Sequence, residues 1–66
     1  MKKVVIEYRY FGETKCVEVM SIDGEDMFDP EGRDGIYFFG YQDFIQNIRD
    51  YVDCEEDFTL KLVKVK

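Results

Sequence analysis

The sequence predicts an α+β domain in which a small antiparallel sheet of three to four strands carries one amphipathic helix across one face. Two segments of alternating apolar residues open the chain around a turn signal, an apolar stripe with helical spacing follows, and another alternating segment comes last. The predicted order is therefore strand, strand, strand, helix, strand. We expect a single domain over residues 1–66, because a chain this short has room for only one hydrophobic core.

The first two strands are predicted over residues 4–10 and 14–22, where apolar and polar residues alternate as in half-buried strands. Between them, Gly12 followed by Glu13 favours a two-residue type II′ turn, which needs Gly in its first position. The two strands are therefore expected to form a tight hairpin.

The register that follows from this turn has a consequence for each face of the hairpin. Tyr8 is expected opposite Val17, so that apolar side chains of both strands share one face. Glu7 is expected opposite Glu18 on the other face, where directly opposed like charges repel. We expect this second face to be solvated.

The rest of the chain contributes a short strand, a helix and a last strand. Residues 36–39 are apolar on both sides and lie between two glycines, which favours a short strand. A helix of about three turns is predicted because five apolar residues follow the helical period, namely Phe44, Ile45, Ile48, Tyr51 and Val52. The last strand is predicted over residues 58–66, where a change of apolar phase at Leu62 indicates a bulge or a partly covered outer face.

Charge is distributed unevenly along the chain. The net charge is −6, but residues 18–57 hold thirteen acidic residues against two arginines, and the ends hold all the lysines. Such a chain is a poor partner for nucleic acid or an anionic membrane, because phosphate binding needs concentrated Lys and Arg. No apolar run approaches the roughly 18 residues of a membrane span. Cys16 and Cys54 are too few for a disulfide scaffold, so we expect a cytoplasmic protein with two free thiols.

Few residues are suited to catalysis. There is no histidine, and the one serine lacks a partner of the kind that activates a nucleophile, so we expect no enzymatic activity. Residues 23–34 have the length of a calcium-binding loop, but Met27, Phe28 and Asp34 stand where an oxygen ligand, a glycine and a bidentate glutamate are needed. The chain also lacks a zinc ligand set and a glycine-rich phosphate loop. The sequence therefore predicts no metal and no cofactor.

Two acidic clusters remain as candidates for a functional surface. The candidate partner-binding residues are the first acidic cluster (Asp23, Glu25, Asp26, Asp29, Glu31 and Asp34), Phe28 within it, and the second acidic cluster (Asp53, Glu55, Glu56 and Asp57). Acidic loops often serve solubility. Acids just after a helix oppose its dipole, however, and an aromatic side chain among carboxylates is typical of an interface.

We expect a non-catalytic acidic module that binds a basic protein surface, such as that of a nuclease or another nucleic-acid-handling enzyme. It would act as an inhibitor or antagonist that imitates the charge of nucleic acid, in the manner of phage antagonists, immunity proteins and antitoxins. Imitation needs both clusters on one surface, because alternate residues of one extended segment are about 6.6 Å apart and one DNA strand carries a charge about every 3.4 Å. The alternative is a small structural or regulatory domain, homodimeric through the edge of residues 36–39, whose charge serves solubility.

Overall fold

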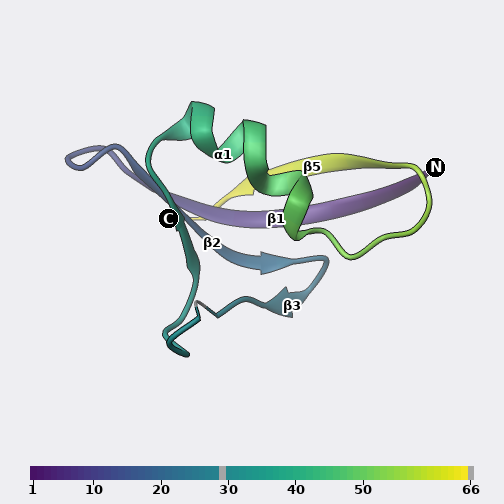
Figure 1. Cartoon of the computed structure of the whole chain (residues 1–66). Helices are drawn as coiled ribbons and strands as arrows, with labels where there is room; N and C mark the ends of the chain where they lie inside the picture. Colours follow the sequence, from purple (N-terminus) through teal and green to yellow (C-terminus); the bar gives the residue numbers. More distant parts are fainter. Residues whose placement is uncertain (29, 66) are drawn as a thin grey trace.

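The computed structural model of the chain describes residues 1–28 and 30–65. Within these residues, a five-stranded mixed sheet and one short helical segment make up the fold (Figure 1). The elements, in chain order, are β1 (Lys2–Phe11), β2 (Cys16–Ile22), β3 (Glu25–Asp26), β4 (Ile36–Phe38), the α-helix α1 (Tyr41–Asn47), the 3₁₀-helix η1 (Ile48–Tyr51) and β5 (Phe58–Lys64). The predicted α+β class is confirmed, whereas the prediction of three to four strands is wrong.

The sheet is mixed rather than antiparallel. β2 pairs with one edge of β1 in the antiparallel sense, and β5 pairs with its other edge in the parallel sense. β3 and β4 both pair with the outer edge of β2. Because β4 is antiparallel to β2, it runs in the direction of β1, and α1 and η1 then carry the chain back to the end where β1 begins (Figure 1). The last strand consequently starts beside the first residue of β1, and the predicted all-antiparallel sheet is wrong.

The β1–β2 hairpin closes through a four-residue loop, residues 12–15, rather than the predicted two-residue turn. Lys15 adopts a left-handed conformation in this loop (φ 58°). The register is displaced by two residues, so that Tyr8 lies opposite Val19 instead of Val17. Side chains alternate between faces with a period of two, and a displacement of two therefore leaves the predicted apolar face intact.

The other face of the hairpin also differs from the prediction. The register shifts between Glu7 and Tyr8, where Met20 of β2 is the extra residue of a bulge, and Glu7 then lies opposite Ser21. The prediction that Glu7 lies opposite Glu18 is therefore wrong. Ser21 Oγ instead donates a hydrogen bond of 2.8 Å to Glu7 Oε1, which replaces a repulsion with an attraction.

β5 follows β1 without a break in register, from the pair Lys2–Phe58 to the pair Tyr8–Lys64. The bulge proposed at Leu62 is therefore absent. Leu62 and its neighbour Val63 are both half-buried, so a partly covered outer face accounts for the change of apolar phase.

The core lies between the inner face of the sheet and the helical segment. Its most deeply buried side chains are Phe44, Ile48, Val4, Ile6, Val17 and Val19. A helix is confirmed at the predicted place, but the prediction of an amphipathic helix of about three turns is wrong, because the α-helix ends at Asn47, a single 3₁₀ turn follows, and the apolar residues do not form one clearly buried face. Phe44 and Ile48 are fully buried, whereas Ile45 and Tyr51 of the predicted apolar stripe are 37% and 46% exposed.

Candidate functional site

The residues of the first acidic cluster lie at several places in the fold. Asp23 lies in the turn between β2 and β3, and Glu25 lies in β3; both line one pocket. Asp26 and Asp34 line a second pocket, on the outer face of the sheet. Glu31 lies between β3 and β4. Asp29 lies outside the described residues. Phe28 is 55% exposed and forms an isolated bridge with Asp34. Met27 lines both the pocket of Asp26 and Asp34 and the pocket of Asp23 and Glu25, so these two pairs of carboxylates lie in neighbouring pockets.

One end of the sheet brings the two acidic clusters together. Asp23 and Glu25 line the same pocket as Asp53, a cavity of about 360 Å³. Two backbone hydrogen bonds explain the meeting, since both segments attach to the start of β1. The N–H of Asp23 donates to a carbonyl of β1 (2.7 Å), and the N–H of Lys2 donates to the carbonyl of Asp57 (3.2 Å).

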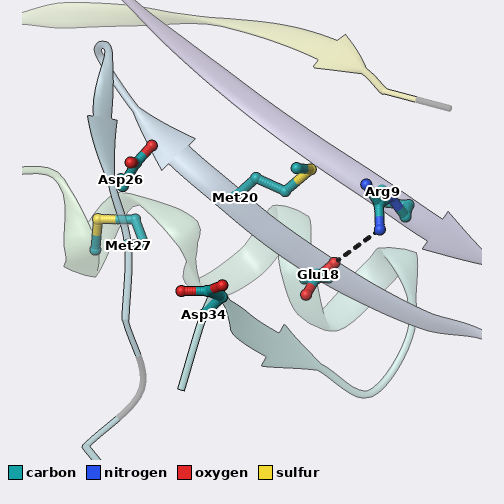
Figure 2. A pocket seen from close by; sticks show the side chains of 7 residues that line it. Arg9, Glu18, Met20, Asp26, Met27 and Asp34 are labelled. Atoms are coloured by element: carbon teal, nitrogen blue, oxygen red, sulfur yellow. Dashed lines mark ion pairs between the residues drawn. The ribbon is translucent and has the colours of Figure 1, made fainter. Parts of the chain in front are cut away.

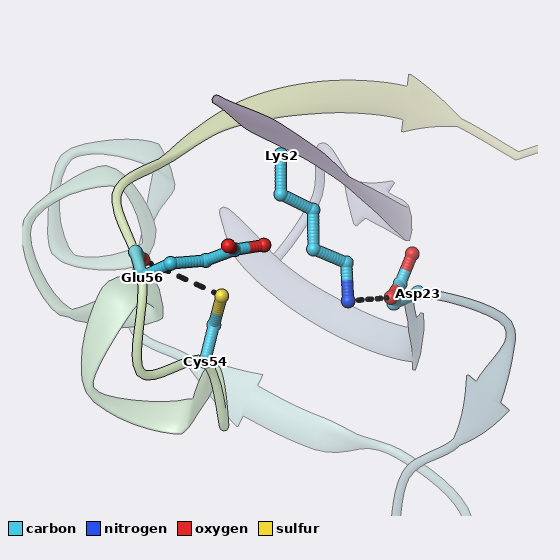
Figure 3. A network of polar contacts seen from close by, with 4 residues as sticks. All are labelled: Lys2, Asp23, Cys54 and Glu56. Atoms are coloured by element: carbon cyan, nitrogen blue, oxygen red, sulfur yellow. Dashed lines mark hydrogen bonds and ion pairs between the residues drawn. The ribbon is translucent and has the colours of Figure 1, made fainter.

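The side chain of Lys2 lies at the centre of this end of the sheet (Figure 3). Its Nζ is 3.0 Å from Asp23 Oδ2, and this contact raises the pKa of Lys2 above its ordinary value. Glu56 contributes a smaller attraction to the same cation, and Figure 3 shows its side chain extended toward Lys2. We call the group Asp23, Glu25, Asp53 and Glu56 the acidic end. Lys2 offsets part of its charge and joins the β2–β3 turn to β1.

The remaining residues of the second acidic cluster, Glu55 and Asp57, are exposed in the loop that leads into β5. Within this loop, Cys54 Sγ donates to the carbonyl of Glu56 at 3.4 Å. Cys16 starts β2 next to the hairpin loop, whereas Cys54 lies near Lys2 at the far end of β1, and both cysteines are free.

A second charged region lies on the outer face of the sheet, where we expected solvation. Glu18 is only 9% exposed. Its Oε2 accepts a hydrogen bond from Tyr37 Oη at 2.8 Å, and its Oε1 lies 3.8 Å from Arg9 Nη1. The hydrogen bond to Glu18, with burial as a smaller cause, raises the pKa of Tyr37. The prediction of a solvated face is thus wrong at Glu18.

Glu18 forms part of a pocket of about 340 Å³ on this face (Figure 2). The other lining residues are Arg9, Met20, Asp26, Met27, Asp34 and Gly35. Sequence reasoning missed Glu18 because its neighbours come from β1, β4 and residues 27–35, which only the folded chain brings together. Over residues 1–28 and 30–65, no group of three or more His, Cys, Asp or Glu side chains is arranged to hold a metal ion.

A third region is a groove of about 290 Å³ beside β4, which we call the aromatic groove. It is lined by Tyr37, Phe38, Phe39, Asp43, Asn47, Asp50 and Tyr51. Phe39 is 92% exposed, although it directly follows a buried residue of β4. The predicted partner-binding residues include none of these, since an apolar run such as residues 36–39 normally indicates a buried strand.

Comparison with known proteins assigns no relative to this chain. It matches no protein-family model, no curated protein and no solved structure. Among the described residues, no helix has the length and apolar character needed to cross a membrane.

Proposed function

We propose that this protein is a non-catalytic binding module whose acidic end docks on a basic surface of a nucleic-acid-handling protein and acts as an inhibitor or antagonist. The observation that supports this function is the meeting of two acidic segments, distant in sequence, around one pocket. Asp23, Glu25 and Asp53 line that pocket, and Glu56 is attracted to the lysine beside it. Acidic residues that serve solubility alone do not need to lie close together, and placing them close together destabilises the fold because like charges repel.

The arrangement also bears on imitation of nucleic acid. Carboxylates along one extended segment are too widely spaced to match a DNA strand. At the acidic end, carboxylates from two segments lie around one pocket, which raises their surface density. Lys2 forms an ion pair with Asp23 and attracts Glu56, so that Glu25 and Asp53 are the carboxylates of the acidic end most directly offered to a partner. Exposed charges of this kind act chiefly on the rate of association and make binding dependent on salt.

Charge reversal at the acidic end tests this function. The protein, immobilised on a resin, is incubated with a cell extract and eluted first with duplex DNA and then with a salt gradient. We expect DNA to displace a basic, nucleic-acid-handling protein, and Glu25→Lys and Asp53→Lys to reduce its retention about tenfold. Glu13→Lys is the matched control, because Glu13 is exposed in the hairpin loop away from the acidic end. Retention that is unchanged in both acidic-end variants would overturn the proposal.

The second candidate function is a homodimeric structural or regulatory domain that associates through β4. One observation favours it: within the described part of the chain, β4 pairs only with β2, and Phe39, the residue directly after β4, is 92% exposed. Sedimentation equilibrium at low and high salt separates the two functions. A dimer that is insensitive to salt and is lost in Phe39→Ala supports this second function, whereas a monomer excludes it.

A further inference from the structure

The aromatic groove exposes three rings on a very small protein. Phe39, Tyr37 and Tyr51 are 92%, 53% and 46% exposed and line the same groove. Aromatic side chains are the residues most enriched at the centres of protein interfaces, and contiguous exposed apolar surface marks interaction sites.

Each of the three rings is attached to a fixed part of the structure. The N–H of Phe39 donates to Asp43 Oδ2 at 3.0 Å, which holds the backbone that carries the exposed ring. Tyr51 packs edge-on against Phe38, with ring centroids 5.6 Å apart. Tyr37 is held through its hydroxyl by Glu18. The backbone of Phe39 and the side chains of Tyr37 and Tyr51 are thus held in place, which lowers the entropy lost when a ligand binds.

The charges around the groove are negative. Asp43 and Asp50 line it, and among the described lining residues there is no lysine or arginine. Arg49, the cation adjacent to Asp50 in sequence, has its guanidinium 4.8 Å from the ring centroid of Phe58 and does not line the groove. A cation entering the groove would therefore meet aromatic side chains and the carboxylate of Asp50, since both oxygens of Asp43 already accept hydrogen bonds.

We propose that the aromatic groove binds an arginine side chain of the basic partner, an inference that rests on the function proposed above. A guanidinium is planar and weakly hydrated, stacks on aromatic faces, and pairs with a carboxylate through two parallel hydrogen bonds. Lysine offers a point charge without the planar fork. The acidic end supplies long-range attraction, and the aromatic groove supplies the anchor that makes the contact specific for arginine.

Nuclear magnetic resonance titration at physiological salt tests this anchor with two probes, a short peptide that contains one arginine and the same peptide with lysine in its place. We expect the arginine peptide to shift the amide signals of Tyr37, Phe39, Asp50 and Tyr51 saturably, and to bind more tightly than the lysine peptide. Phe39→Ala and Asp50→Asn should each weaken it about fivefold. Phe28→Ala and Glu55→Gln are the matched controls, since both residues are exposed and neither lines the groove.

The outcomes separate this inference from the proposed function. Peptide shifts confined to Glu25 and Asp53 would overturn the arginine site and leave the acidic end in place. Equal binding of the arginine and lysine peptides, unaffected by Phe39→Ala, would also overturn the arginine site. The same holds if the amide signals shift with protein concentration in the absence of peptide and these shifts vanish in Phe39→Ala, because the groove would then bind a second copy of the protein. An arginine-specific response at the groove, combined with partner retention unaffected by Glu25→Lys and Asp53→Lys, would support the groove and overturn the acidic end.

Discussion

Glu18 has a different environment from the one its local sequence predicts. An acidic residue on the outer face of an N-terminal hairpin is expected to be solvated. In the fold it is enclosed by a hydrogen bond from Tyr37 on one side and the guanidinium of Arg9 on the other. Gly35 lies so close that a Cβ built on it would be 2.8 Å from Glu18 Cγ. Partners from β1 and β4 therefore satisfy a carboxylate that would otherwise be costly to bury.

The close approach of Gly35 can be tested against a glycine in the same conformation. Gly24 and Gly35 have φ values of 86° and 87°, but no described atom lies within 4 Å of a Cβ on Gly24. We expect Gly24→Ala to lower the free energy of unfolding by about 1 kcal/mol, the cost of a left-handed alanine. Gly35→Ala should lose about 1–3 kcal/mol more, because Glu18 must move. Urea unfolding measures both, and equal losses would contradict this packing.

The hydrogen bond between Tyr37 and Glu18 predicts a dependence of stability on alkaline pH. It raises the pKa of Tyr37 above the ordinary 10.0. A raised folded-state pKa contributes stability that is complete below the unfolded pKa and is lost as pH rises through the folded pKa. We expect Tyr37→Phe to be about 1 kcal/mol less stable at neutral pH and to approach the original protein in stability above about pH 10.

Thermal melts of both proteins from neutral to alkaline pH check this expectation. Burial also raises the pKa of Tyr8, but Tyr8 is present in both proteins, so the difference between them reports Tyr37. A stability difference that stays constant across the alkaline range would contradict the hydrogen bond.

At the scale of elements, one side chain organises the start of α1. The N-cap is Gly40, which has no side chain to cap the helix. The helix therefore has no side-chain cap, and Asp43 in its first turn instead holds the chain that enters it, since its Oδ2 accepts from the N–H of Phe39. Its Oδ1 also accepts from Asn47 Nδ2 at 2.7 Å, and its charge complements the helix dipole.

Removal of this carboxylate should destabilise the helix. We expect Asp43→Ala to lower the free energy of unfolding by about 1 kcal/mol, because the hydrogen bonds from the N–H of Phe39 and from Asn47 Nδ2 are lost. Gln42→Ala is the control, because Gln42 is exposed in the same turn and alanine favours a helix. Circular dichroism during thermal unfolding measures both variants. If both variants lose the same stability, the hydrogen bonds of the Asp43 carboxylate do not stabilise the start of α1.

The elements differ in how far they can be predicted from local sequence. Residues 4–10 and 14–22 alternate strongly, and both strands form. β3 has only two residues, too few for any periodic signal, and exists because it pairs with the end of β2. The direction of β5 has no local signal either, since its parallel pairing depends on where η1 returns the chain.

At the scale of the whole molecule, Phe44 connects the helical segment to the sheet. It is fully buried, and its ring lies 5.1 Å from that of Tyr8, 5.7 Å from that of Phe38 and 5.8 Å from that of Tyr41. These rings come from β1, β4 and α1. A chain of 66 residues has little further core to compensate for its loss.

Truncation of Phe44 should therefore unfold the protein. Phe44→Ala is expected to cost about 3–5 kcal/mol, as much as the roughly 3–5 kcal/mol that a core of this size supplies. Phe44→Leu should remain folded with a loss of about 1–2 kcal/mol. The control is Phe39→Ala, the same chemical change at a ring that is 92% exposed, with an expected change below about 0.5 kcal/mol. Thermal melts and the dispersion of amide signals check all three, and a folded Phe44→Ala would contradict this role.

The sequence by itself determined the α+β class, which face of the first hairpin is apolar, and where the acidic residues lie along the chain. These follow from local sequence. The predicted apolar face is correct although the predicted register is displaced by two residues, because side chains alternate with a period of two. Only the tertiary structure decided the parallel position of β5, the burial of Glu18, the meeting of Asp23 with Asp53, and the exposure of Phe39. Each of these depends on contacts between segments far apart in the chain, and such contacts are selected by the packing of the whole core rather than by local pattern.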